Sequence, residues 1–127
     1  MGIESPAVVG SAAMARWCRP EMESLLALST FPNQEIARST VRALVEKRLI
    51  ACGNILPGIE SIYRWKGKIE SGSETLVLFK LSTSNYEAFE RELRSLHPYD
   101  VPELIAFPIE RGSSTYLQWI AENCTQL

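Results

Sequence analysis

The sequence is poor in the residues that mark several common classes of protein. A single histidine in 127 residues excludes a metal cage built from several histidines of one chain. The three cysteines, Cys18, Cys52 and Cys124, are an odd number at long spacings, which fits neither a disulfide framework nor a zinc knuckle. No uninterrupted apolar run is longer than four residues, so we expect no membrane-spanning helix. Reduced thiols and no membrane span favour a cytoplasmic protein.

The sequence also lacks a strong charge of either sign. Thirteen Lys and Arg residues against fifteen Asp and Glu residues give a net charge of −2, which argues against a dedicated binder of nucleic acid or of anionic membranes. A glycine-rich phosphate loop is absent, and Ser113 and Ser114 have no evident base, so we expect no enzyme. Apolar residues make up 46% of the chain, as in a soluble protein with one compact domain.

The chain divides into two parts by composition. Residues 1–23 are rich in Ala, Ser, Gly and Pro and have no apolar periodicity, which predicts a poorly ordered N-terminal tail. Residues 24–127 are predicted to form the folded domain.

Apolar periodicity within the domain predicts the order β-α-β-β-α-β-α. The natural packing is a ferredoxin-like split βαβ sandwich of the α+β class, with a four-stranded antiparallel sheet, a long central hairpin and an extra C-terminal helix. Pro57-Gly58 predicts a bulge, Lys66-Gly67 a tight hairpin turn, and Gly72 a second bulge. The expected strands cover 25–29, 50–65, 68–81 and 103–109, and the expected helices begin near 34, at a capping box starting at 84, and at a cap at 114.

The predicted hairpin has an unusual length. Its arms have about 12 to 15 residues, against 5–6 in a typical strand. A domain of this size cannot cover both arms, and uncovered strand edges pair with other chains or aggregate. We therefore expect edge-to-edge assembly into a closed oligomer.

Four segments in order resemble one known family. They are ACGNILPG at 51–58, SIYRWKGKI at 61–69, HPYDVPE at 97–103 and YLQW at 116–119. Together they resemble the CutA family of divalent-cation tolerance proteins, over about residues 25–123. The resemblance implies a ferredoxin-like fold, a homotrimer joined through the long hairpins, and an association with copper and other divalent cations.

The resemblance also implies a set of metal ligands. Relatives are proposed to bind copper through a cysteine at the end of the first strand, the histidine of His-Pro-Tyr and the glutamate of Pro-Glu. Here Ser29 holds the cysteine position, which leaves His97 and Glu103 as candidate ligands for Cu(II) or another divalent metal. The metal is not expected to be needed for folding. A histidine at the end of a helix can instead be structural, because it can bond an unpaired carbonyl there.

A set of aromatic and charged residues suggests a second kind of site. Aromatic walls with a few polar groups suit a small-molecule cleft, and the same residue types are common in subunit interfaces. The candidates are Tyr63, Trp65, Lys68, Glu74, Lys80, Tyr99, Tyr116 and Trp119.

The sequence therefore supports two hypotheses. One is a non-enzymatic homotrimer of the CutA type, linked to divalent-cation tolerance or response, with modest metal binding. The alternative is a trimeric small-molecule sensor with clefts between subunits, like those of PII-type signalling proteins, an analogy that rests on the fold alone.

Overall fold

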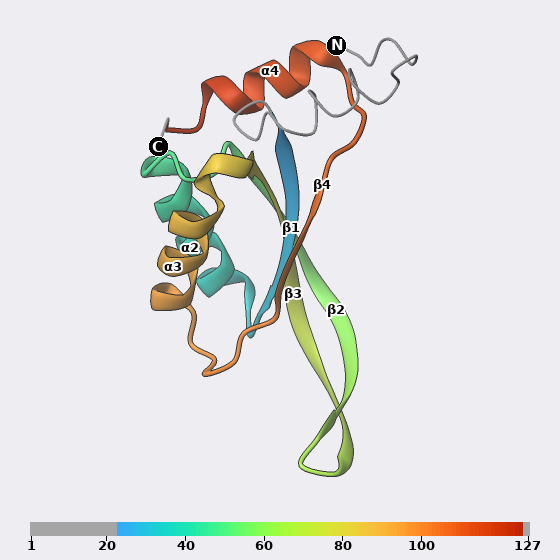
Figure 1. Cartoon of the computed structure of the whole chain (residues 1–127). Helices are drawn as coiled ribbons and strands as arrows, with labels where there is room; N and C mark the ends of the chain where they lie inside the picture. The colour runs from blue at the N-terminus through green and yellow to red at the C-terminus, as the bar shows by residue number, and fades with distance from the viewer. Residues whose placement is uncertain (1–22, 126–127) are drawn as a thin grey trace.

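The computed structural model describes residues 23–125, so nearly all of the predicted N-terminal tail lies outside the described part. The described chain contains four strands and three α-helices in the predicted order (Figure 1). They are β1 (Ser24–Phe31), α2 (Gln34–Glu46), β2 (Cys52–Trp65), β3 (Lys68–Ser82), α3 (Tyr86–Leu96), β4 (Leu104–Pro108) and α4 (Ser114–Glu122), with a 3-10 turn η2 (Thr83–Asn85) before α3. None of these helices is long and apolar enough to cross a membrane.

The four strands form one antiparallel sheet in the order β2-β3-β1-β4. Helices α2 and α3 cover one face of this sheet, and α4 lies across its end, remote from the hairpin turn (Figure 1). The α+β ferredoxin-like fold, the long central hairpin and the extra C-terminal helix are thus confirmed.

The core lies between the sheet and helices α2 and α3. Alternate residues of β3 from Thr75 to Leu81 are buried, as expected of a strand with one face on the core. Phe79 from β3 and Phe89 from α3 meet edge to face, with ring centroids 5.1 Å apart. Gly53 on β2 lets α2 approach closely, because a Cβ at this position would lie 2.6 Å from Cγ1 of Val41.

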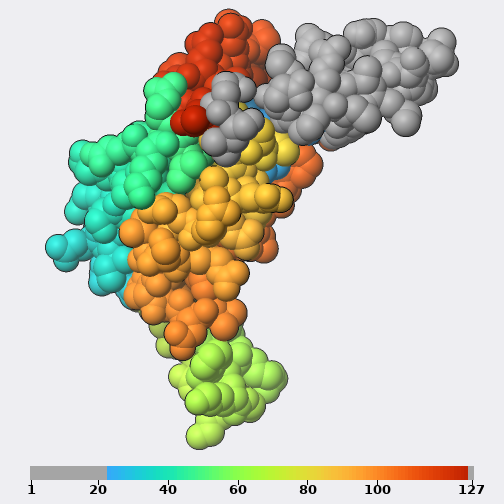
Figure 2. Space-filling model, turned by 60° about the vertical axis from the view of Figure 1, so that its left-hand side comes forward, coloured from blue at the N-terminus to red at the C-terminus, as the bar shows by residue number. Residues whose placement is uncertain are grey.

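The hairpin extends well beyond this core. The register between β2 and β3 shifts between Leu56 and Ile59, where Gly58 has φ +78°, so the predicted bulge is confirmed. The turn at Lys66 and Gly67 has positive φ at both residues, as a two-residue turn matched to strand twist requires. The outer part of the hairpin projects from the body of the molecule (Figures 1 and 2). The bulge expected at Gly72 is absent, because Gly72 pairs in register with Ser61.

Two helix starts differ from the sequence prediction. The segment after Ser82 first forms η2, and α3 begins at Tyr86 without a side-chain cap. The reason is tertiary: Asn85 is buried and its Nδ2 donates to the carbonyl of Arg48, so this segment is held against its neighbours. In α4 the capping residue is Ser113, whose Oγ accepts from the backbone N–H of Tyr116.

Candidate ligand pocket

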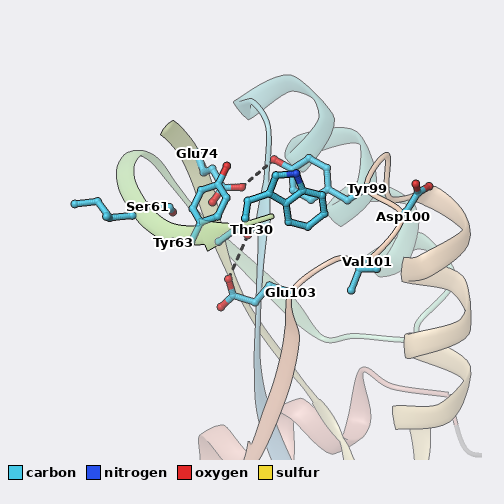
Figure 3. A pocket seen from close by; sticks show the side chains of 10 residues that line it. Thr30, Ser61, Tyr63, Glu74, Tyr99, Asp100, Val101 and Glu103 are labelled. Carbon is cyan, nitrogen blue, oxygen red and sulfur yellow. Dashed lines mark hydrogen bonds between the residues drawn. The ribbon is translucent and has the colours of Figure 1, made fainter. Parts of the chain in front are cut away.

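A pocket of about 690 Å³ lies along the outer part of the projecting hairpin, where three segments meet. The outer hairpin forms one wall, the end of β1 forms the floor, and the loop between α3 and β4 forms the opposite wall (Figure 3). The lining residues are Thr30, Ser61, Ile62, Tyr63, Trp65, Glu74, Tyr99, Asp100, Val101 and Glu103.

Strand register explains why the hairpin residues of this pocket share a face. Ser61 pairs with Gly72 and Ile59 with Glu74, and directly opposed residues of antiparallel strands point to the same side. Because side chains alternate along a strand, Ser61, Tyr63 and Trp65 of β2 lie on the same face as Glu74 of β3. The pairing therefore places two aromatic rings and a carboxylate along one wall.

His97 fixes the opposite wall to the sheet. Its Nδ1 accepts a hydrogen bond from the backbone N–H of Tyr99 at 3.1 Å, so Nδ1 carries no proton. Nε2 therefore carries the proton and donates to the carbonyl of Thr30 at 2.8 Å. The ring also stacks on Phe31, with centroids 4.5 Å apart. Burial lowers the pKa of His97, and its bond to Thr30 and the charge of Glu74 oppose this only in part, so the ring is neutral at pH 7.

Tyr99 joins the two walls of the pocket. Its hydroxyl donates to Oε2 of Glu74 at 2.8 Å (Figure 3). Burial and then this hydrogen bond raise the pKa of Tyr99 to about 12, so the phenol keeps its proton at neutral pH. The hydroxyl is therefore a fixed donor to Glu74.

Glu103 is held by the end of β1. Its backbone carbonyl accepts from Oγ of Ser29 at 2.6 Å, and its Oε1 accepts from Oγ1 of Thr30 at 3.4 Å. Ser29 is fully buried, so its hydroxyl serves to fix the start of β4. Oε2 of Glu103 has no hydrogen-bond partner among residues 23–125.

The structure brings the predicted metal ligands to one end of β1 but directs most of their ligating atoms to the backbone. Both nitrogens of His97 and the hydroxyl of Ser29 are used in hydrogen bonds. Within the described range no group of three or more His, Cys, Asp or Glu residues could hold a metal ion. The donor set therefore does not fit a closed metal centre, and of these three positions only the Glu103 carboxylate keeps an unused oxygen.

The residues predicted for one cleft divide between two places. Four of them line the pocket: Tyr63, Trp65, Glu74 and Tyr99. Lys68 is the strand partner of Trp65 next to the turn, but it is not part of the lining. The remaining three predicted residues lie together at the end of the hairpin remote from its turn. Lys80 of β3 is 5.9 Å from the ring of Tyr116 on α4, and Tyr116 stacks on Trp119.

Sequence reasoning missed several lining residues. Asp100 and Val101 lie inside the HPYDVPE segment, so the signal was present and only their role was overlooked. Thr30 and Ser61 are small polar residues in strands, and only the tertiary structure shows that they face the pocket.

Comparison with known proteins agrees with this architecture. A family described as CutA1 divalent ion tolerance protein matches residues 25–123. The chain belongs to this family. The resemblance found from four sequence segments is thus confirmed.

Individual relatives and solved structures show how far the similarity extends. The divalent-cation tolerance protein CutA of Thermus thermophilus is 47% identical over 96 residues, which cover 76% of this chain and 93% of that protein. Protein CutA of Homo sapiens is 50% identical over 96 residues, but the chain spans only 54% of its length. The crystal structure of CutA1 from Oryza sativa has a TM-score of 0.81 at 36% identity, covering 83% of this chain and 96% of that one. The Thermus thermophilus structure has a TM-score of 0.78 at 44% identity, covering 80% and 99%.

Proposed function

We propose that this CutA-family chain is a non-enzymatic, cytoplasmic protein of divalent-cation tolerance that works as a homotrimer. The observation that carries the proposal is the projecting hairpin, whose outer half is mostly exposed in the described chain. Family membership supplies the link to divalent cations, since the family is described by tolerance to them and not by a reaction.

Exposed apolar surface supports the assembly. Ile62 and Ile69 on the outer hairpin are 67% and 64% exposed, and Phe107 is exposed on β4. Strands β2 and β4 are the two edges of the sheet, so each presents backbone groups that no strand of the same chain pairs. A ring of copies that joins edge to edge buries both features, and closure of the ring prevents open-ended growth.

Sedimentation equilibrium at micromolar concentration tests the assembly. The expected mass is three times the 14.3 kDa of the chain. A monomer mass under these conditions would contradict the proposal.

We propose that direct metal binding is modest and centred on the Glu103 carboxylate. This carboxylate has one unused oxygen, whereas His97 could ligate a metal only after losing its bond to Tyr99 or to Thr30. A single carboxylate binds divalent ions weakly, in keeping with the missing closed centre.

Calorimetry with Cu(II) tests this assignment. Glu103→Gln is expected to lose the binding heat, while His97→Gln is expected to retain it. The reverse result would assign the metal to the histidine. The matched control is Glu60→Gln, which removes one carboxylate from the opposite face of the hairpin.

The alternative of a PII-type small-molecule sensor with clefts between subunits gains nothing from the comparisons. The pocket itself argues against an anionic ligand, because its lining includes three carboxylates and no lysine or arginine.

A further inference from the structure

The charge of the pocket is unbalanced. Glu74, Asp100 and Glu103 all line it, and no basic side chain does. The two salt bridges found among residues 23–125 are both elsewhere, between Lys47 and Glu92 and between Arg94 and Glu90. His97 behind the wall is neutral and directs both nitrogens to backbone groups. Carboxylates gathered in a partly enclosed site without counter-charge favour a cationic ligand.

Two of these carboxylates offer free acceptor atoms to the pocket. Glu74 uses Oε2 for the hydroxyl of Tyr99, which leaves Oε1 without a partner in the described chain. Glu103 has only a 3.4 Å contact from Thr30 to Oε1 and leaves Oε2 free. Figure 3 shows Glu74, Tyr63 and Tyr99 grouped together with Glu103 below them, whereas Asp100 lies to one side at the rim. These free oxygens can accept hydrogen bonds from a ligand that carries N–H donors.

The size and walls of the pocket distinguish an organic cation from a metal ion. Its volume of about 690 Å³ is far larger than a bare divalent ion requires and falls in the range of small-molecule sites. The lining includes the rings of Tyr63, Trp65 and Tyr99. The faces of such rings attract cations and pack against apolar bodies. Gly72, on the same face as Ser61, adds no side chain to this wall, and a Cβ there would meet only open space.

We propose that this pocket binds a small organic cation, in which a primary ammonium group is attached to an aromatic or similarly apolar body. The ammonium group donates to the free oxygens of Glu74 and Glu103, and the apolar body packs against Tyr63 and Trp65. A quaternary ammonium has no N–H donor, so it leaves both carboxylates without hydrogen bonds and binds more weakly. The proposal goes beyond the metal and trimer proposals, but it shares Glu103 with the first and Ile62 of the outer hairpin with the second. Because Glu103 is shared, the organic cation and a divalent metal compete.

Benzylamine is a suitable probe, because benzyl alcohol provides a neutral counterpart of nearly the same shape. Each is titrated by calorimetry into the full-length protein freed of metal by EDTA and dialysis, at neutral pH. Benzylamine is expected to bind saturably, and benzyl alcohol and benzoate at least tenfold more weakly. Equal binding of benzylamine and benzyl alcohol would show an apolar pocket without cation selectivity and would overturn the proposal.

Matched variants locate the binding. Glu74→Gln keeps an acceptor for the Tyr99 hydroxyl but removes the charge, and is expected to weaken benzylamine binding at least tenfold. Glu60→Gln removes the same charge from the other face of the hairpin and is expected to leave binding unchanged. Equal effects of the two variants would mean that only net charge matters, and would overturn the assignment to this pocket.

The same chemistry could be supplied by a lysine side chain of a second copy of the chain. In that case benzylamine does not bind the assembled protein, and Glu74→Gln lowers the mass found by sedimentation. This result would overturn the small-molecule proposal and assign the pocket to the subunit interface. If benzylamine does not bind and Glu74→Gln leaves the mass unchanged, neither a small organic cation nor a lysine of a second copy occupies the pocket. Neither result bears on the Cu(II) titration, so failure here is distinguishable from failure of the proposed function.

Discussion

His97 joins two segments of the pocket wall by donating from Nε2 to the carbonyl of Thr30 and accepting at Nδ1 from the N–H of Tyr99. The side chain is 8% exposed and stacks on Phe31. A neutral ring is the form that satisfies both bonds, because a protonated Nδ1 cannot accept. The position of the loop that contains residues 99–103 therefore depends on the protonation state of His97.

Acidification is expected to destabilise the fold through His97. Its pKa is lowered from 6.5 in the folded state, so the unfolded chain takes up the proton first as the pH falls. The stabilisation is complete above pH 6.5 and is lost progressively below it. Urea unfolding at pH 7.5 and 5.5 measures this loss. His97→Gln is expected to be less stable at pH 7.5 by about 2 kcal/mol and to show a smaller drop between the two pH values. An equal drop in both proteins would contradict the role of His97.

Removal of the Tyr99 hydroxyl tests the bridge to Glu74. The phenol of Tyr99 has a pKa raised to about 12, so it contributes little to the absorbance change of ionising tyrosines below pH 11. Tyr99→Phe is therefore expected to leave the 295 nm titration between pH 8 and 11 almost unchanged, although one tyrosine in four has been removed. The variant should also lose about 1 kcal/mol of stability, for the one hydrogen bond. Burial also raises the pKa of Tyr86, so loss of a quarter or more of the absorbance change would show that Tyr99 ionises as an ordinary tyrosine.

Two glycines on the hairpin are expected to respond differently to the same substitution. A Cβ at Gly53 would lie 2.6 Å from Cγ1 of Val41, so Gly53→Ala must push α2 away from the sheet and is expected to cost about 1–3 kcal/mol. A Cβ at Gly72 meets nothing within 4 Å, so Gly72→Ala is expected to be neutral or slightly stabilising. Denaturant midpoints of the two variants provide the measurement. Similar midpoints would show that α2 does not pack on β2 as closely as described.

A charge on the outer hairpin is expected to weaken the assembly. Ile69 is 64% exposed in the single chain and lies next to the turn, so Ile69→Glu places a carboxylate in the proposed contact between copies. Sedimentation equilibrium should show its mass falling toward 14.3 kDa at micromolar concentration. Ser39→Glu, which adds the same charge to the exposed face of α2, is expected to keep the mass of the unchanged protein. If both variants retain that mass, Ile69 is not in the contact.

The fold could be predicted from the sequence because its signals are local. Lys66-Gly67 needs positive φ at both positions and fixes the hairpin turn, and Pro57-Gly58 marks the bulge within β2. The start of α3 could not be predicted in this way. Ser84 has the residue spacing of a capping box, but the bond from Asn85 to the carbonyl of Arg48 depends on a segment 37 residues earlier in the chain.

The composition of the pocket could be predicted only in part. Lys68 and Lys80 both lie on β3, and residue type alone does not distinguish them. At about 3.3 Å per residue, they are roughly 40 Å apart along the strand. Neither lines the pocket, whereas Glu74 between them does. The role of His97 depends on the Thr30 carbonyl, 67 residues away in sequence, so no local pattern could reveal that both of its nitrogens are occupied.

The bulge between Leu56 and Ile59 divides the hairpin into an inner part that packs on the core and an outer part that does not. Toward the body, substitutions disturb the packing of α2 on β2 and the buried side of β3. Toward the turn, most side chains are exposed and contribute nothing to the interior of the described chain. Substitutions at this end of the molecule can therefore change the proposed ligand pocket and the proposed contact between copies while the folded scaffold stays the same.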